Sequence, residues 1–380
     1  MKRVFAKTSL SSSRRFAAGI DVSPAGVRVV VISQRLAGSA EIRVEHVGYA
    51  PLPIDAMVQA EIIDPAAVAA SIVTALEVFF NHGAGASLRA AMALPPAATV
   101  LATLPLAQCE PPQQPKHRHD TFVPGVPDRT VADAVWRGVT RVPSELALDR
   151  LEPGVRAQAE ALSGLERSAL AVDWLRAAAP YVPSDHLTIA AAAQELIDAR
   201  IETAVGAGLH LVALDAEPLA ALRACRFDAA REVDDDEIYA VLWIGHDSFY
   251  LWALQRGQRV RELRMPLTSV TAQSILSPLS TFARGLTTQI ALPGTAAQFD
   301  NPLDCAWVAG ELDELVRLGI DLDVIGAALG CPVFEFDCNS EHPHTGASVA
   351  TSPSPSPVRS HCRPAVLAVA FGLALRAVLL

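Results

Sequence analysis

Short apolar runs alternate with turn residues at the start of the chain. Three runs rich in apolar and β-branched residues are separated by glycine, proline or serine, as short strands are. They cover residues 19–22, 27–32 and 41–49, and they predict a three-stranded meander. Apolar residues then recur every three or four positions over 65–80, directly after Asp64. This spacing predicts an amphipathic helix with an aspartate cap, followed by strands over 88–94 and 98–104.

The same order of elements returns in the second half of the chain. Two short turns, His246-Asp247 and Arg256-Gly257, separate three further apolar runs over 238–245, 248–255 and 258–265. Helices and strands are predicted after them, over residues 275–291, 306–308, 312–317 and 333–336. Two meanders, each followed by helices and strands, predict a duplicated α/β unit.

The segment between the two copies has a mixed pattern. Five prolines lie within residues 107–129 and prevent regular structure, so we expect an insertion to begin there. Helical spacing follows over 131–140 and 154–175. The pattern then predicts alternating strands and helices, over residues 187–192, 194–207, 209–215 and from Glu217 onward.

The two ends of the chain differ from its centre in amino-acid composition. Residues 1–16 carry five cations and no acid, which predicts a solvated tail or, alternatively, a basic arm on anionic lipid head groups. Residues 339–363 are rich in serine and proline and predict a linker. The apolar end, 365–380, is shorter than the roughly 20 residues of a membrane span. We therefore expect a buried helix there, with a tail anchor as the alternative.

Composition narrows the class of protein. Of the 380 residues, 51% are hydrophobic and 19% are charged, which excludes a disordered chain. A net charge of −10 argues against a nucleic-acid partner, because such binding depends on neutralising phosphates. The six cysteines have neither zinc-site spacing nor the density of a disulfide scaffold. These features favour a reduced, cytoplasmic protein.

The turns of the two meanders are candidate phosphate-binding loops. Backbone N–H groups at such turns can point at phosphate oxygens, and an acid at a strand end can hold hydrated magnesium. The candidate nucleotide-binding residues are Asp21, Ser23, Glu217, Gly245, His246 and Gly310. Asp21 would hold the metal through water. The alternative interpretation of Asp21 and Gly245 is ordinary turn chemistry.

The order of these strands, helices and turns along the chain resembles that of the actin-like superfamily and, more narrowly, that of the PilM family of type IV pilus assembly proteins. The resemblance covers most of the chain and is thin over 107–170 and 265–300. The blocks that carry it are residues 19–29, 44–46, 51–53, 61–65, 91–105, 189–192, 207–217 and 368–376.

The resemblance implies an actin-like fold, which is α/β with two lobes from a duplicated ribonuclease H-like unit and an inserted small subdomain. The first lobe would comprise 17–106 and 186–230, the inserted subdomain 107–185, and the second lobe 237–338. A C-terminal helix, 364–380, would pack on the core.

The resemblance also implies a function and partners. PilM-like proteins are adaptors on the cytoplasmic face of the inner membrane, where they bind the N-terminal cytoplasmic peptide of PilN. PilO would be an indirect partner, and pilus motor ATPases further candidates. The implied cofactor is ATP with magnesium.

Three residues depart from the family pattern in the loops. Pro24 lacks an N–H, Trp243 stands where the second loop has an aspartate, and Glu311 follows Gly310 in the adenosine loop. These departures predict a degenerate nucleotide site without ATPase activity. The alternative is an active ATPase related to the cell-division protein FtsA.

Overall fold

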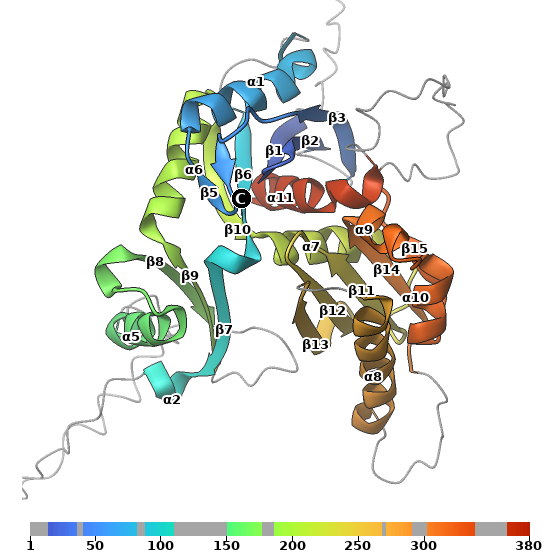
Figure 1. The fold of residues 1–380 in the computed structure, drawn as a ribbon. Coiled ribbons are helices and arrows are strands. Elements are labelled where there is room, and N and C mark those ends of the chain that lie inside the picture. Colours follow the sequence, from blue (N-terminus) through green and yellow to red (C-terminus); the bar gives the residue numbers. More distant parts are fainter. Residues whose placement is uncertain are drawn as a thin grey trace, which may run out of the picture. The chain divides into compact units, whose positions relative to one another are not determined.

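The computed structural model describes residues 14–35, 41–81, 88–109, 150–176, 186–267, 271–290, 302–338 and 363–380 (Figure 1). The chain divides into two compact units, Met1–Thr99 with Glu195–Leu380, and Val100–Gln194. The predicted helix 131–140 lies outside the described residues, as do 1–13 of the predicted tail and 339–362 of the predicted linker.

Two five-stranded sheets with the same strand order form the first unit. In each, an antiparallel meander is extended on its first strand by two parallel strands, in the orders β3-β2-β1-β6-β10 and β13-β12-β11-β14-β15. The predicted duplication of an α/β unit is therefore confirmed. The strands of the first sheet are β1 (Arg14–Ser23), β2 (Gly26–Arg35), β3 (Ile42–Ala50), β6 (Arg89–Leu94) and β10 (His210–Ala216). Those of the second are β11 (Ile238–Ile244), β12 (Ser248–Gln255), β13 (Gln258–Pro266), β14 (Cys305–Gly310) and β15 (Val333–Glu335).

Helices cover both faces of each sheet, because the central strands are apolar on both sides. One cluster packs α1 (Pro65–Asn81) and α6 (Gln194–Gly206) against the first sheet. A second cluster places α7 (Glu217–Ala229) and α11 (Ala368–Leu379) between the two sheets. A third packs three helices on the far face of the second sheet: α8 (Ala272–Ile290), α9 (Leu312–Arg317) and α10 (Leu322–Leu329). The short elements of this unit are β4 (Met57–Val58), β5 (Glu61–Ile62), η1 (Pro96–Ala98) and η4 (Pro364–Leu367).

The second unit has its own three-stranded sheet, in the order β7-β9-β8. Its helix α5 packs on this sheet through Val155 and Ala159. The strands are β7 (Thr99–Pro105), β8 (Leu170–Arg176) and β9 (His186–Ala193), and the helical segments are α2 (Leu106–Cys109), α5 (Glu152–Ser163) and η2 (Arg167–Ala169).

Two sequence-based expectations change in this unit. The helix predicted over 154–175 ends at Ser163, because Gly164 takes a left-handed φ of 70° and β8 begins at Leu170. Strand β9, which the sequence assigned to the first lobe, pairs with β8 from Leu187 to Ala193. The unit therefore starts and ends several residues outside the expected 107–185.

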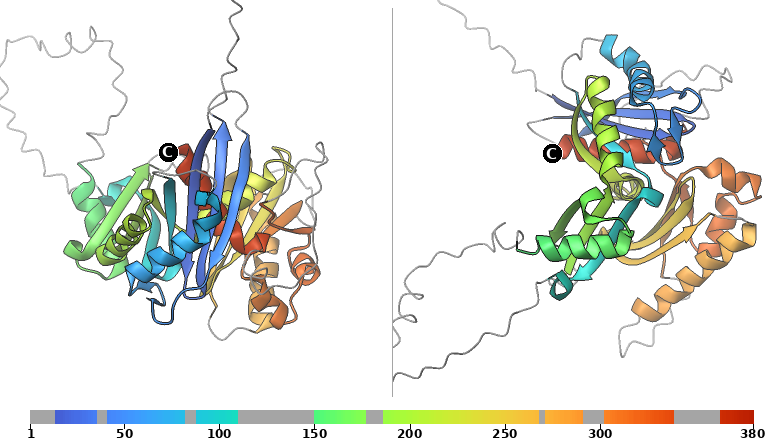
Figure 2. Two further views of the ribbon diagram at one scale, coloured as in Figure 1. Left: turned by 90° about the horizontal axis from the view of Figure 1, so that it is seen from above. Right: turned by 60° about the vertical axis from the view of Figure 1, so that its left-hand side comes forward.

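The C-terminal helix lies at the centre of the first unit. Ten residues of α11 are buried, and the helix lies against β1 and β2 in both views of Figure 2. It approaches its neighbours backbone to backbone: a Cβ on Gly19 would lie 1.8 Å from the Ala370 carbonyl oxygen, and one on Gly372 would lie 1.8 Å from the Ala220 carbonyl oxygen. Within the described residues, no helix combines the length and apolar character needed to cross a membrane.

Gly372→Ala should lower the free energy of unfolding by about 2–3 kcal/mol, because the new methyl group forces α11 away from α7. Urea unfolding followed by circular dichroism measures the change. Gly319→Ala is the control: it has a φ of +74° and open space around its Cβ position, so it should cost only about 1 kcal/mol. Equal losses in the two variants would contradict the close approach.

Candidate functional site

The β1–β2 hairpin places an acid and a cation opposite each other. Its turn at Pro24-Ala25 sets the register in which Asp21 pairs with Arg28. The Arg28 Nη1 atom lies 3.4 Å from Asp21 Oδ2, and the two residues are only 6% and 5% exposed. A buried cation is stable only with acids around it, so Arg28 needs further negative charge.

That charge comes from the second sheet. Arg28 Nη2 donates to Glu311 Oε1 at 2.7 Å, across 283 positions of sequence. Glu311 follows the end of β14, where Gly310 has a φ of +99° and a Cβ would meet the Ile244 carbonyl oxygen at 1.9 Å. Only glycine fits there, and the Glu311 N–H donates to the same carbonyl oxygen. The Arg28–Glu311 ion pair therefore joins the ends of the two sheets.

More acids surround this ion pair. Burial raises the pKa of Glu217, the first residue of α7, well above its usual value of 4.5. The charges of Asp21 and Asp247 raise the pKa of Glu217 further, whereas Arg200 and Arg28 lower it. Burial also raises the pKa of Asp21, against the opposing effect of Arg28. The site thus holds more carboxylates than cations.

Only some of the predicted site residues lie in this cluster. Asp21, Glu217 and the backbone of Gly310 contribute to this cluster. The Ser23 hydroxyl donates to the Gly26 carbonyl oxygen within its own turn, at 3.3 Å. Gly245 lies in the β11–β12 turn, where its N–H donates to the Ser248 carbonyl oxygen, and His246 is exposed beside it. No contact of His246 with Asp21 or Glu217 is seen among the described residues.

Sequence reasoning missed three members of the cluster. Arg28 could have been found, because a two-residue turn at 24–25 sets position 28 opposite position 21. Asp247 lies in the turn that the sequence singled out, four residues after Trp243, whose ring packs 5.8 Å from Tyr250. No pattern in the sequence indicated that Arg200 belongs to the cluster. It is 1% exposed and donates to three carbonyl oxygens, those of Ala93, Leu196 and Ala60.

The cluster can be tested for its fit to a nucleotide. A polyphosphate would compete with Glu311 for the Arg28 guanidinium and would meet the charges of Asp21, Glu217 and Asp247. Pro24 offers no N–H to a phosphate oxygen. Across the described residues, no group of three or more histidines, cysteines or acids is arranged to hold a metal ion. These residues do not fit a nucleotide while the ion pair is intact.

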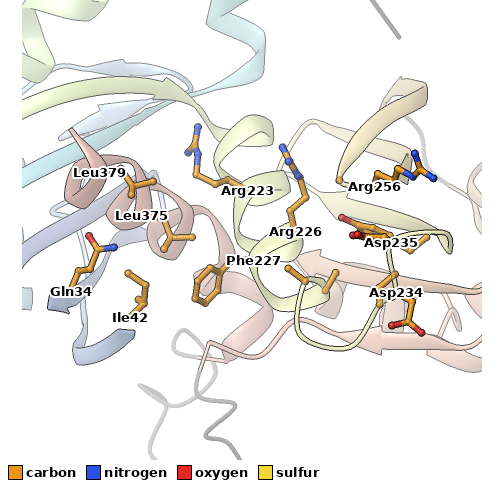
Figure 3. A pocket seen from close by; sticks show the side chains of 15 residues that line it. Gln34, Ile42, Arg223, Arg226, Phe227, Asp234, Asp235, Arg256, Leu375 and Leu379 are labelled. Atoms are coloured by element: carbon orange, nitrogen blue, oxygen red, sulfur yellow. The ribbon is translucent and has the colours of Figure 1, made fainter. Parts of the chain in front are cut away.

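A groove of about 660 Å³ lies elsewhere on the first unit, beside α7 and the end of α11 (Figure 3). Apolar residues line it together with both arginines and aspartates. The arginines are Arg223, Arg226 and Arg256, and the aspartates are Asp234 and Asp235. This volume is within the range of ligand-binding pockets.

Comparison with known proteins supports the fold. No protein-family model matches the chain, and no curated protein matches its sequence. The structure is similar to the PilM–PilN type IV pilus biogenesis complex, with a TM-score of 0.60 and 18% identity over 95% of this chain and 98% of that one.

Two further structures are more distant. A Bacteroides thetaiotaomicron protein with an actin-like ATPase fold and unknown function has a TM-score of 0.40 at 8% identity, over 87% of this chain and 94% of that one. The ethanolamine utilization protein EutJ from Carboxydothermus hydrogenoformans has a TM-score of 0.38 at 13% identity, over 95% and 89%. The strand order and the likeness to the PilM–PilN complex together confirm the predicted two-lobed actin-like fold.

Glu311→Gln should lower the free energy of unfolding by about 1–2 kcal/mol, because Arg28 then loses the closer of its two ion pairs and keeps the one with Asp21. This is less than for a fully buried pair, since the Glu311 side chain is 32% exposed. Glu314→Gln removes the exposed pair with Arg317 and should change stability by less than about 0.5 kcal/mol. Denaturant titration measures the free energy of unfolding of the two variants. Equal losses would argue against a stabilising Arg28–Glu311 ion pair.

Glu217→Gln should stabilise the protein at pH 8 and lose this advantage as the pH falls toward 4.5. The folded state raises the pKa of Glu217, so the carboxyl favours folding at low pH and that stability is lost as the pH rises. Unfolding free energies measured from pH 4.5 to 8 test this. Glu202→Gln, on the exposed face of α6, is the control and should change the free energy of unfolding by less than about 0.5 kcal/mol.

Proposed function

We propose that this protein is an actin-like adaptor of type IV pilus assembly that binds the N-terminal cytoplasmic peptide of a PilN-like membrane protein. The observation that carries the proposal is the likeness to the PilM–PilN complex over nearly the whole length of both chains. The local sequence resemblance to the PilM family supports it, because its blocks run from residue 19 to 376.

This function implies a place and further partners. A PilN-like partner anchored in the inner membrane would hold the protein at the cytoplasmic face of that membrane. A PilO-like protein would then be linked indirectly, through the PilN-like partner, and pilus motor ATPases are further candidate partners.

The proposed adaptor acts without ATP turnover. A phosphate that binds Arg28 would have to displace Glu311 from it, and the surrounding acids disfavour a polyanion. If ATP and magnesium bound, Asp21 would hold the metal through water. The backbone at Gly310 and Gly245 could then lie close to the nucleotide, because glycine has no side chain. This charge balance favours the adaptor over an active ATPase related to FtsA.

We place the peptide on the inserted unit, within the region 131–185 that the family resemblance indicates. There β8 is at an edge of its sheet among the described strands, and an extended peptide can add to such an edge. Val172 and Trp174 of β8 pack toward the α5 cluster, whereas Asp173 and Leu175 are exposed. Leu175 is 57% exposed and offers an apolar contact.

Leu175→Glu should weaken binding of a labelled PilN N-terminal peptide roughly tenfold, because an exposed anchor becomes a charge. Fluorescence anisotropy with a peptide from a PilN-like protein of the same genome measures the affinity. Leu162→Glu is the matched control, since Leu162 is an exposed leucine of α5, the helix that covers the sheet. Circular dichroism should show both variants folded.

Two results would contradict the proposal. The first is no binding of the peptide to the parent protein, even at high peptide concentration. The second is magnesium-dependent ATP turnover that Asp21→Ala abolishes, which would favour the ATPase instead.

A further inference from the structure

Helix α1 is apolar on its exposed side as well as on the side that packs on the first sheet. Its 17 residues include one charged side chain, Glu77. The exposed side consists mainly of alanine and valine, and Val73 and Val78 are 42% and 61% exposed. A surface helix normally carries polar residues toward solvent, whereas a helix that is apolar all round is normally covered. We therefore expect the exposed side of α1 to have a partner.

Helix α6 extends this apolar surface. Both helices pack on the same face of the first sheet (Figure 1), and a Cβ on Gly206 would lie 3.1 Å from the Ala69 Cβ. Ile201 and Val205, one turn apart on α6, are 44% and 70% exposed. We refer to the exposed apolar and acidic side chains here as the outer face: Val73, Glu77, Val78, Ile201, Glu202 and Val205.

The charges of the outer face have one sign. Glu77 and Glu202 are exposed, and neither forms an ion pair with a described residue. Arg200 is the only cation of α1 and α6, and it is 1% exposed and already donates to backbone carbonyl oxygens. An apolar segment with cations is attracted to such a face, whereas an acidic segment is repelled. The outer face therefore selects a basic, apolar occupant.

Residues 1–13 of this chain have that chemistry. They lie outside the described residues and directly precede β1, which begins at Arg14. They contain no acid. Their cations and larger apolar residues are Lys2, Arg3, Val4, Phe5, Lys7 and Leu10.

Residues 1–13 are also within reach of the outer face. The ring of Phe16, near the start of β1, lies 6.0 Å from the ring of Phe79, near the end of α1. A segment of 13 residues can span up to about 43 Å, whereas the 17 residues of α1 extend for about 25 Å. The segment is therefore long enough to follow α1 back to its start and to reach α6.

We propose that residues 1–13 dock on the outer face of α1 and α6. Their apolar side chains cover the exposed valines, and their cations lie beside Glu77 and Glu202. Docking removes apolar surface from water and supplies cations to acids that have none. The same acids repel an anionic lipid surface, so the outer face favours the chain's own basic segment over a membrane. This docking is independent of the function proposed above.

Zero-length carbodiimide crosslinking of the full-length protein, which joins an amine to an adjacent carboxylate, tests the docking. The chain has three lysines, Lys2, Lys7 and Lys116, so mass spectrometry can assign every crosslink that starts from residues 1–13. Lys2 or Lys7 should be joined to Glu77 or Glu202 within one chain.

Val78→Ser should lower the yield of these crosslinks about threefold, because it removes apolar contact and leaves the lysines and glutamates in place. Val316→Ser is the matched control. Val316 of α9 has the same exposed fraction of 61%, and its substitution should leave the yield unchanged.

Charge exchange gives a second measurement, the fluorescence anisotropy of a dye on the N-terminal amine. Lys2→Glu/Lys7→Glu should lower the ratio of docked to free segment about threefold, because like charges then face each other. Adding Glu77→Lys/Glu202→Lys to the same chain should restore the anisotropy, since both signs are exchanged. Restoration would show that the first pair of substitutions had not unfolded the protein.

Several results would overturn the proposal. They are no crosslink between residues 1–13 and the outer face of the parent protein, equal losses with Val78→Ser and Val316→Ser, or no restoration on charge exchange. Crosslinks found only between two chains would assign the outer face to the segment of a second copy. Binding to phosphatidylglycerol vesicles that needs Lys2 and Lys7, without any such crosslink, would assign the segment to lipid.

Discussion

The position of α11 is the constraint on which the first unit depends. This last helix of the chain fills the space between the two sheets, so neither sheet has a complete core until α11 docks. Its closeness to β1 and α7 requires glycine at Gly19 and Gly372, because any side chain there would overlap a carbonyl oxygen. Since packing at this density tolerates no extra atoms, the spacing of the two sheets follows from the helix between them.

That spacing brings charged residues of the two sheets together. The end of β1, the turn after β11 and the junction after β14 bring Asp21, Asp247 and Glu311 to one cluster. Burying so many acids is unfavourable, as the raised pKa values of Asp21 and Glu217 indicate. Arg28 offsets part of that cost by pairing with acids from both sheets. The cluster is thus an ion-pair network in which Arg28 is already paired with Asp21 and Glu311.

Surfaces outside the cluster are better suited to recognition. The groove beside α7 is lined by apolar residues together with both arginines and aspartates. The open edge of β8 offers backbone groups and an exposed leucine. An extended peptide can add a strand to an open sheet edge such as that of β8.

Local pattern alone determined the elements and their duplication. Apolar runs and turn residues located both meanders, and the two-residue turn after Ser23 contained the information to pair Asp21 with Arg28, although that pair was not predicted. Periodicity failed at 154–175, where Gly164 ends the helix, and it could not assign β9 to a sheet. Only the tertiary structure decided the Arg28–Glu311 bridge and the groove lined by Phe227 and Leu375. The reason is physical: periodicity reports which face of an element is buried, whereas contacts between residues hundreds of positions apart depend on how whole elements pack.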